Sequence, residues 1–233
     1  MPKLSIVIPC YNEEKTIKKI LKKVTKAKLP MVWEREIIVV DDGSKDNTKE
    51  ILKTLKNKIK LIFKEKNEGK GAALKKGFKA VTGDYILIQD ADLEYNPDDY
   101  IKLLQPILNN KTKIVFGSRN LKKGNIRFNW LYFYGNLFLS EVFNLLFGTK
   151  FTDVSTCYKL FPKKVIPELI QLSGNDFVFD VIELTYQLTK EGKIIEVPIN
   201  YKARTKKEGK KINWRHGVKC LILMLKIKFR TSL

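Results

Sequence analysis

The sequence has little of what holds small secreted or zinc-binding domains together. Among its 233 residues there are only three cysteines, Cys10, Cys157 and Cys220, and one histidine, His216. The cysteines are odd in number, far apart and form no CxxC pair, which argues against both a disulfide framework and a zinc site. Because no second histidine is available for a metal site or a catalytic dyad, we interpret His216 as a structural or surface residue.

Long apolar runs are also absent. Residues 130–148 are aromatic and aliphatic but are interrupted by polar side chains, and residues 218–227 contain two lysines. A transmembrane helix needs about 20 predominantly apolar residues, so we expect neither segment to span a membrane. We expect an amphipathic helix over 130–148 that packs on the core, with a position at a membrane interface as the alternative. Residues 1–3 lead directly into an apolar strand pattern with no signal-peptide core, so we expect a cytoplasmic protein.

Basic residues are abundant. The chain has 45 lysines and arginines against 25 aspartates and glutamates, a net charge of +20, and its 44% of apolar residues excludes a disordered tail. The charge predicts an anionic partner (nucleic acid, a membrane leaflet or a phosphorylated small molecule), or it reflects lysines that solvate exposed helix faces. A nucleic-acid-binding protein is the less favoured interpretation, because the basic residues are dispersed and no nucleic-acid-binding motif is present.

Short apolar runs alternate with helical periodicity in the first half of the chain. The helical pattern is clearest at Ile17, Ile20, Leu21 and Val24, which recur with lysines between them. Such an alternation predicts an α/β fold with a mostly parallel sheet covered by helices on both faces. In such sheets, ligands bind outside the carboxyl ends of the strands. The apolar runs are at residues 4–8, 37–40, 61–63, 85–88 and 114–116.

Acidic residues collect where the predicted strands end. They are Glu13 and Glu14 after the first run, Asp41 and Asp42 after the second, and Asp90, Asp92 and Glu94 after the fourth. Ordinary turn and helix-cap roles explain residues 44–48 but not the Asp-x-Asp at 90–92. Like charges so close together repel unless a cation lies among them, and hard divalent cations bind oxygen ligands. The pattern therefore predicts Mg²⁺ or Mn²⁺ with positions left open for substrate phosphates.

These motifs resemble the nucleotide-binding half of family-two glycosyltransferases with the A-type fold. The segments that carry the resemblance are 5–14 (SIVIPCYNEE), 39–44 (VVDDGS), 67–73 (NEGKGAA), 90–92 (DAD) and 117–119 (GSR). Within the family the chain is most similar to the dolichyl-phosphate mannose synthases and the bacterial polyprenyl-phosphate transferases, over about residues 4–217. The resemblance implies one Rossmann-like domain, with a nucleotide-sugar-binding half at 1–120 and an acceptor-binding half at 121–233 that contains the amphipathic helix and a basic C-terminal loop.

The resemblance also implies a donor site. It places Pro9, Tyr11 and Glu13 at the base and ribose, Val40, Asp41 and Asp42 as hydrogen-bond acceptors there, and Asp90, Ala91 and Asp92 at the diphosphate. It assigns Asp90, Asp92 and Glu94 to the metal. Relatives often have Gln at the position of Glu94, and this departure predicts a tighter metal site or a different sugar preference. Lys70, in a glycine-bracketed loop, is either a phosphate ligand or a plain helix-start lysine.

The acceptor decides which further residues are needed. A lipid phosphate is already a nucleophile near neutral pH and needs cations rather than a base. Arg119 is the first candidate, although a salt bridge to a carboxylate would also explain it, and Arg204 is the second, with Lys210 and Lys211 nearby.

A hydroxyl acceptor would instead need a positioned base. Asp153 is the best candidate, with Asp180 and Glu183 behind it. Two departures weaken the phosphate interpretation: residues 156–158 lack the glycine-containing segment of phosphate-acceptor relatives, and the nearest match to their second arginine is Arg127.

We therefore predict a metal-dependent, inverting glycosyltransferase that transfers a hexose from a GDP- or UDP-linked sugar to a polyprenyl phosphate. Asp92, Arg119 and Asp153 are its predicted catalytic residues, and Arg119 and Arg204 also belong to the predicted donor site. We expect peripheral attachment to an anionic membrane surface on the cytoplasmic side, and no nucleic-acid partner. A transferase for saccharide hydroxyls in cell-surface glycan synthesis is the alternative, and a nucleic-acid-binding protein a distant one.

Overall fold

The alternating pattern folds into one seven-stranded sheet. The structure is a computed structural model that describes residues 1–55, 59–125, 130–205 and 214–230. The strand order is β3-β2-β1-β4-β6-β5-β7; β6 runs antiparallel to both of its neighbours and the other pairs are parallel. The strands are β1 (Lys3–Cys10), β2 (Glu34–Asp41), β3 (Lys60–Phe63), β4 (Tyr85–Ile88), β5 (Ile114–Ser118), β6 (Lys159–Pro162) and β7 (Ile194–Pro198).

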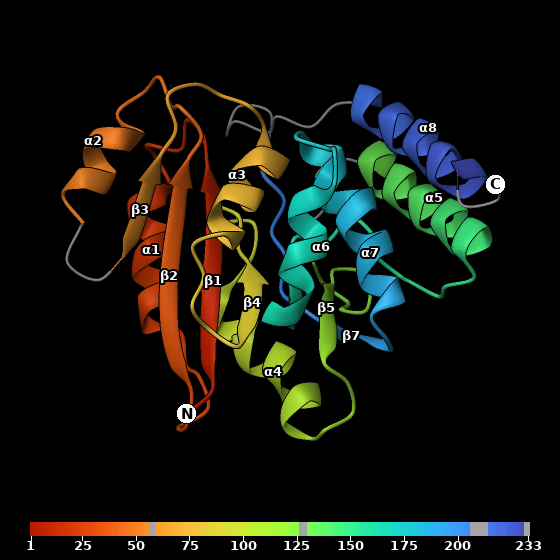
Figure 1. The fold of residues 1–233 in the computed structure, drawn as a ribbon, viewed down its shortest axis with the longest axis horizontal. Helices are drawn as coiled ribbons and strands as arrows, with labels where there is room; N and C mark the ends of the chain where they lie inside the picture. Colours follow the sequence, from red (N-terminus) through yellow and green to blue (C-terminus); the bar gives the residue numbers. More distant parts are fainter. Residues whose placement is uncertain (56–58, 126–129, 206–213, 231–233) are drawn as a thin grey trace.

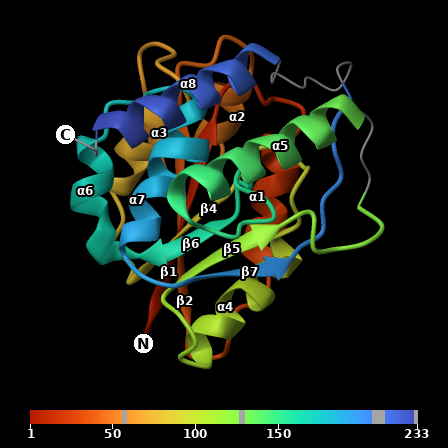
Figure 2. The ribbon, with the colours of Figure 1, turned by 90° about the vertical axis from the view of Figure 1, so that its right-hand side faces the viewer.

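Helices cover both faces of this sheet, as predicted. Figures 1 and 2 show α3, α6 and α7 on one face, and α1 and α4 on the other. The helices are α1 (Ile17–Lys26), α2 (Thr48–Lys53), α3 (Lys70–Phe78), α4 (Tyr100–Leu108), α5 (Trp130–Phe147), α6 (Ile166–Gln171), α7 (Leu184–Lys190) and α8 (Trp214–Arg230). Short 3₁₀ turns (Pro97–Asp99, Lys163–Val165) precede α4 and α6, and a π-helical turn (Phe179–Glu183) precedes α7.

The periodicity of the sequence accounts for the main packing layers. The predicted stripe on α1 is buried, with Ile17, Ile20 and Val24 fully inaccessible to solvent. The apolar runs of β1 and β2 are buried on both faces, which is the pattern of strands inside a helix-covered parallel sheet.

The strand register brings the acidic strand ends to one edge. β1 pairs with β2 so that Cys10 lies opposite Asp41, and β1 pairs with β4 on its other side. The segments that leave β1, β2 and β4 therefore emerge next to one another.

The sequence pattern did not indicate β6 or β7. β6 is only four residues long, and it begins with Lys159 and ends with Pro162, so it lacks a β-branched run. It lies between β4 and β5, and it places Lys159 in the core with no exposed surface.

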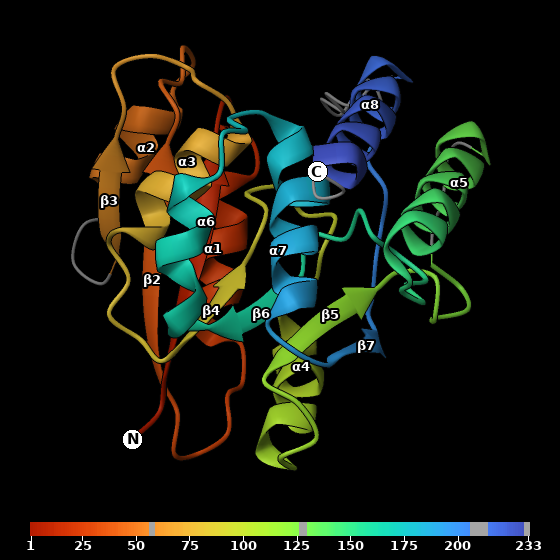
Figure 3. The same cartoon turned by 45° about the vertical axis from the view of Figure 1, so that its right-hand side comes forward.

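Helices α5 and α8 contact each other and run side by side in Figure 1, and Figure 3 shows that both lie beyond the helices that cover the sheet. In α5, Phe143 is buried and contacts the core, whereas Trp130, Tyr134 and Phe138 are exposed, so the helix has one packed side and one open apolar side. Within the part of the chain that the structure describes, no helix is both long and apolar enough to cross a membrane.

Candidate active site

A cavity of about 370 Å³ lies at the carboxyl ends of the strands. Most of the predicted donor residues line it: Pro9, Tyr11, Glu13, Asp42, Lys70, Asp90, Ala91, Asp92, Glu94 and Arg204. The fold thus brings together side chains that come from both halves of the sequence. We call this cavity the donor pocket.

Three residues predicted for the donor site do not line this pocket. Val40 is buried within β2, and Asp41 turns its carboxylate to Ser44, whose hydroxyl and amide both donate to Oδ1. Arg119 is paired with Asp153 and lies over the ring of Tyr201, whose hydroxyl donates to the lining residue Glu94. A strand-end motif does not indicate which way each side chain turns.

Asp42 fixes one wall of the donor pocket. Its carboxylate accepts hydrogen bonds from Lys64 Nζ at 2.5 Å, from the amide of Gly69 at 2.8 Å and from the amide of Glu68. This carboxylate therefore holds the turn that leads into α3, and it does so from the neighbouring strand end.

The glycines that flank Lys70 lie against a distant segment of the chain. A Cβ atom on Gly71 would lie 2.6 Å from Cβ of Phe179, and one on Gly69 would collide with the Asn175 carbonyl. The amides of Gly71 and Ala72, at the start of α3, donate to the carbonyls of Asp176 and Asn175. The small residues thus allow the segment at residues 175–179 to approach the start of α3 closely.

Lys70 is a pocket residue and not a surface lysine. Its ammonium lies 2.7 Å from Asp90 Oδ1 and 2.8 Å from Asp180 Oδ2. Burial alone would lower its pKa, but the two carboxylates outweigh burial and raise the pKa well above its ordinary value. Lys70 is therefore a fixed cation in the pocket.

Arg204 occupies the centre of the acidic cluster. Its Nη1 atom lies 3.0 Å from Glu13 Oε2 and its Nη2 atom 2.8 Å from Asp92 Oδ2. Burial, followed by the charges of Asp90 and Glu94, raises the pKa of Asp92 to about 7 despite this guanidinium. The carboxylates therefore carry more negative charge than the arginine balances.

Glu94 anchors the segment that carries Arg204. Its carboxylate accepts from Tyr201 Oη at 2.8 Å and from the amide of Arg204 at 2.6 Å. Each of its two carboxylate oxygens accepts one of these bonds.

The predicted three-carboxylate metal cluster is not assembled. Among the described residues, no group of three or more metal-ligating side chains is in position to hold an ion, since Asp90 faces Lys70 while Asp92 and Glu94 face Arg204. The donor set still fits a divalent cation, because Mg²⁺ is commonly held by one or two carboxylates together with substrate phosphates. Asp92, whose charge is only partly compensated, is the best-placed ligand and Asp90 is next.

Arg119 and Asp153 form a buried, bidentate ion pair. Arg119 Nε and Nη2 lie 2.7 and 2.6 Å from the two oxygens of Asp153, and the amide of Arg119 donates to the same carboxylate. Burial would raise the pKa of Asp153, but Arg119 outweighs burial and lowers it. Asp153 has no exposed surface, while the Arg119 side chain keeps 17% of its own, so the arginine is the member of the pair that a substrate can reach.

The other two candidate bases are engaged as well. Asp180 contacts Lys70 and Lys159, and these two cations lower its pKa against the effect of burial. Glu183 accepts from the amide of Gly174 at 2.8 Å and from the hydroxyl of Ser173. Both carboxylates therefore already have protein partners.

Several lining residues had not been predicted for the donor pocket. His216, which we interpreted as structural or as a surface residue, lies at the pocket with Asp176 and Phe177, and its ring contacts Phe177 edge to face. Cys10, Asn67, Gly69 and Ala73 complete the lining. Motif position could have indicated Cys10, Asn67 and Gly69, but nothing in the sequence indicated that α8 would reach the pocket. Arg127, Lys210 and Lys211 lie outside the described residues.

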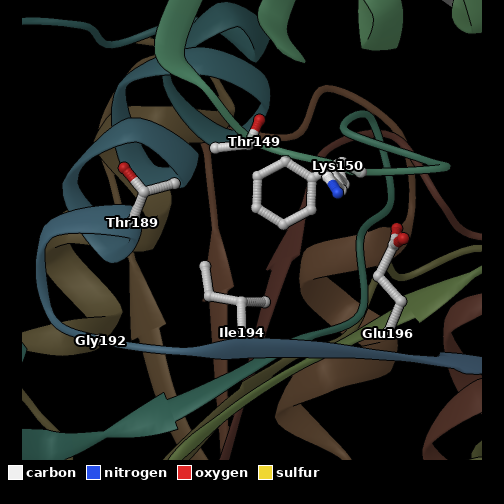
Figure 4. A pocket seen from close by; sticks show the side chains of 7 residues that line it. Thr149, Lys150, Thr189, Gly192, Ile194 and Glu196 are labelled. Carbon is white, nitrogen blue, oxygen red and sulfur yellow. The ribbon is translucent and has the colours of Figure 1, made fainter.

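A second cavity of about 290 Å³ lies beside β7. Figure 4 shows Ile194 and Glu196 of β7 facing Thr149 and Lys150 across it. Glu196 accepts hydrogen bonds from the amides of Thr152 and Asp153, so this cavity adjoins the support of the Arg119–Asp153 pair.

Comparison with known proteins identifies related sequences and folds. The family model described as Glycosyl transferase family 2 matches residues 5–170. A dolichol-phosphate mannosyltransferase of Pyrococcus furiosus is 30% identical over 220 residues, which make up 89% of this chain and 59% of that protein. A UDP-N-acetylglucosamine–dolichyl-phosphate N-acetylglucosaminyltransferase of Methanococcus voltae is 34% identical over 184 residues, or 70% of this chain and 71% of that protein. This chain therefore spans less than two thirds of the Pyrococcus protein.

The fold has solved counterparts. Glucosyl-3-phosphoglycerate synthase of Mycobacterium tuberculosis, in complex with Mn²⁺, UDP and glucosyl-3-phosphoglycerate, superposes with a TM-score of 0.70 at 17% identity, over 97% of this chain and 80% of that one. The predicted A-type glycosyltransferase fold is confirmed.

Proposed function

The chain belongs to glycosyl transferase family 2, and we propose that it is a metal-dependent, inverting transferase that moves a hexose from a nucleotide sugar to a polyprenyl phosphate. The relatives named for transfer to dolichyl phosphate support this choice of acceptor class. A single displacement by the acceptor phosphate inverts the anomeric carbon.

The donor pocket supplies the groups that a nucleoside diphosphate needs. Tyr11 and Asp42 line the part nearest β1 and β2, where they bind the base and ribose. Lys70 and Arg204 are cations that line the pocket, and both are held by carboxylates before the donor arrives. Donor phosphates replace those carboxylates as partners, which releases Asp90 and Asp92.

Asp92, with Asp90, would hold Mg²⁺ or Mn²⁺ against the diphosphate. The ion stabilises the charge that develops on the departing nucleoside diphosphate. Solved complexes of glucosyl-3-phosphoglycerate synthase, which has the same fold, contain Mn²⁺ together with UDP or UDP-glucose, and this supports the assignment.

One observation carries the choice of a phosphate acceptor. Each of the three carboxylates considered as a base (Asp153, Asp180 and Glu183) is already bound to cations or to backbone amides. A phosphomonoester is largely dianionic at neutral pH and needs no base. Arg119, held rigidly by Asp153, binds such a phosphate through its remaining surface.

Helices α5 and α8 provide the attachment to the membrane that holds the lipid. Trp214, Val218, Ile222, Leu225 and Phe229 form one exposed stripe along α8, at helical spacing. Lysines on the same helix complement anionic lipid headgroups. We therefore place the protein peripherally at the cytoplasmic face of the membrane, with an anionic leaflet as its partner and nucleic acid excluded as one.

The test is a transfer assay on the purified chain. GDP-mannose, UDP-glucose and UDP-GlcNAc are each supplied with Mn²⁺ or with EDTA, and a polyprenyl phosphate is compared with the polyprenol that lacks the phosphate. We expect metal-dependent transfer from one donor to the phosphate and none to the alcohol. A saccharide acceptor is tested in parallel, and transfer to its hydroxyls without any to the lipid phosphate would instead establish the alternative acceptor class.

A further inference from the structure

We infer that Asp180 is a positioning residue for the donor: it holds the Lys70 ammonium in the donor pocket, and Lys159 supplies the buried charge that balances it. The inference deepens the proposed function and rests on it. It concerns a residue behind the pocket wall that does not itself line the pocket.

The geometry is a row of alternating charges. Lys159 Nζ lies 3.3 Å from Asp180 Oδ1, and Asp180 Oδ2 lies 2.8 Å from Lys70 Nζ. Lys70 Nζ then lies 2.7 Å from Asp90 Oδ1 at the pocket. Lys159 has no exposed surface and Asp180 has 1%, so the row runs from the core to the donor pocket.

The backbone holds Asp180 in this place. Asp180 lies in the π-helical turn Phe179–Glu183, and single π turns are frequent at functional sites. Phe179 packs against Gly71 at the start of α3, so Asp180 and Lys70 approach each other from two fixed segments. Glu183 ties the other end of the turn to Gly174.

We expect the two carboxylates that hold Lys70 to behave differently when a donor binds. Lys70 has two carboxylate partners, and one of them, Asp90, is released when a donor and a metal bind. Asp180 then becomes the carboxylate that keeps Lys70 in place. A lysine side chain has large rotamer entropy, so fixing it in advance removes a cost from donor binding.

Lys159 extends the row to the acceptor side. Its ammonium also donates to the carbonyl of Thr156 at 2.5 Å, in the segment that follows Asp153. Asp180 is thus linked through Lys159 to the segment that follows Asp153. Without Lys159, Asp180 would still be paired with Lys70; without Asp180, two buried ammonium groups would face each other.

The experiment separates donor positioning from stability. Binding of GDP and UDP in the presence of Mn²⁺ is measured by calorimetry, and stability by urea unfolding, for the wild type and for Asp180→Asn, Lys159→Met, the Asp180→Asn/Lys159→Met double variant and Lys70→Met. We expect Asp180→Asn to weaken binding of the preferred nucleotide by about tenfold or more, the range for loss of a charge-assisted contact. Lys159→Met should change that affinity by less than about threefold, because Lys70 keeps both of its carboxylates.

The double variant is the decisive protein. Replacing both members of a buried ion pair leaves no uncompensated charge. We therefore expect the free energy of unfolding of the double variant to be higher than that of Asp180→Asn. Its nucleotide affinity should stay as low as that of Lys70→Met. Adding Lys70→Met to the double variant should weaken binding no further, because both changes remove the same contact.

Three results overturn the inference. If the wild type binds a nucleotide and the double variant binds it equally well, Asp180 is a structural residue and the proposed function stands. If the wild type binds neither nucleotide, the proposed function and this role both fail. Additive losses in the triple variant would likewise contradict a shared contact.

Discussion

At the scale of single residues, Asp153 acts on Arg119. Its carboxylate is fully buried and accepts hydrogen bonds from both Nε and Nη2 of Arg119, so it sets the orientation of the guanidinium. Asn136 donates to the same carboxylate at 3.0 Å, which further fixes it.

We expect Asp153→Asn to abolish most transfer and to spare donor binding. The amide cannot bind both guanidinium nitrogens, so Arg119 loses its orientation toward the acceptor while the donor pocket is unchanged. Turnover should fall by about a hundredfold, with the nucleotide affinity within about threefold of wild type. Steady-state assays and calorimetry measure the two effects, and an equal loss in both would contradict the assignment of Arg119 to the acceptor.

Asp92 predicts a pH dependence of stability in the metal-free protein. Its pKa is raised from the ordinary 3.8 to about 7, so the folded state keeps a proton that the unfolded state releases. The stabilisation from this proton is complete below about pH 4 and is lost as the pH rises through about 7. The amide of the Asp92→Asn variant does not ionise, so its free energy of unfolding does not fall in this way as the pH rises.

The measurement is urea unfolding of both proteins in EDTA at about pH 5 and about pH 8. The stability of Asp92→Asn relative to wild type should rise between these two values, by about 1 kcal/mol or more. A difference that stays constant with pH would show that the Asp92 carboxyl titrates normally.

At the scale of elements, the start of α3 and the π-helical turn form one unit. Gly71 allows Phe179 to approach the helix backbone, and the amides of α3 donate to the carbonyls of Asn175 and Asp176. The position of Lys70 therefore depends on a contact between segments that are far apart in the sequence.

Gly71→Ala should disrupt this unit. The new methyl would lie 2.6 Å from Phe179 Cβ, so the turn must move and destabilise the protein by about 1–3 kcal/mol. Gly135→Ala on α5 is the matched control, because nothing lies within 4 Å of its added methyl and alanine is the better helix former. Thermal or urea unfolding measures the stability of both variants. Equal stability of Gly71→Ala and Gly135→Ala would contradict the close approach of Phe179 to Gly71.

At the scale of the whole molecule, apolar surface is concentrated on one pair of helices. α5 exposes Trp130, Leu131 and Phe138, and the neighbouring α8 exposes Trp214 and Phe229, each more than half accessible. An exposed patch of this kind marks an interaction surface, and its aromatic side chains suit a membrane interface.

Trp214→Ser/Phe229→Ser should weaken binding to anionic vesicles by about tenfold while leaving nucleotide affinity unchanged. Met31→Ser/Val32→Ser is the control, since these apolar side chains are also exposed but lie between α1 and β2. Vesicle sedimentation measures the binding, and added salt should weaken it. Equal binding of the two double variants would exclude α8 as the attachment surface.

The sequence by itself determined the strands β1 to β5, the buried stripe of α1 and the acidic strand ends. These are local properties: periodicity follows from the geometry of a single helix or strand, and the carboxyl end of a strand is fixed by its direction. Most of the donor pocket, from Pro9 to Glu94, could be predicted from them together with the family resemblance.

Only the tertiary structure decided which charges meet. Arg204 reaches Glu13, which is 191 positions away, and His216 reaches the donor pocket from α8. It also decided that Asp153 and Asp180 are partners in buried ion pairs, and that Gly71, beside Lys70, allows Phe179 to approach. Partner choice depends on distances through space, and those distances are fixed only when the apolar layers pack and bring remote segments together.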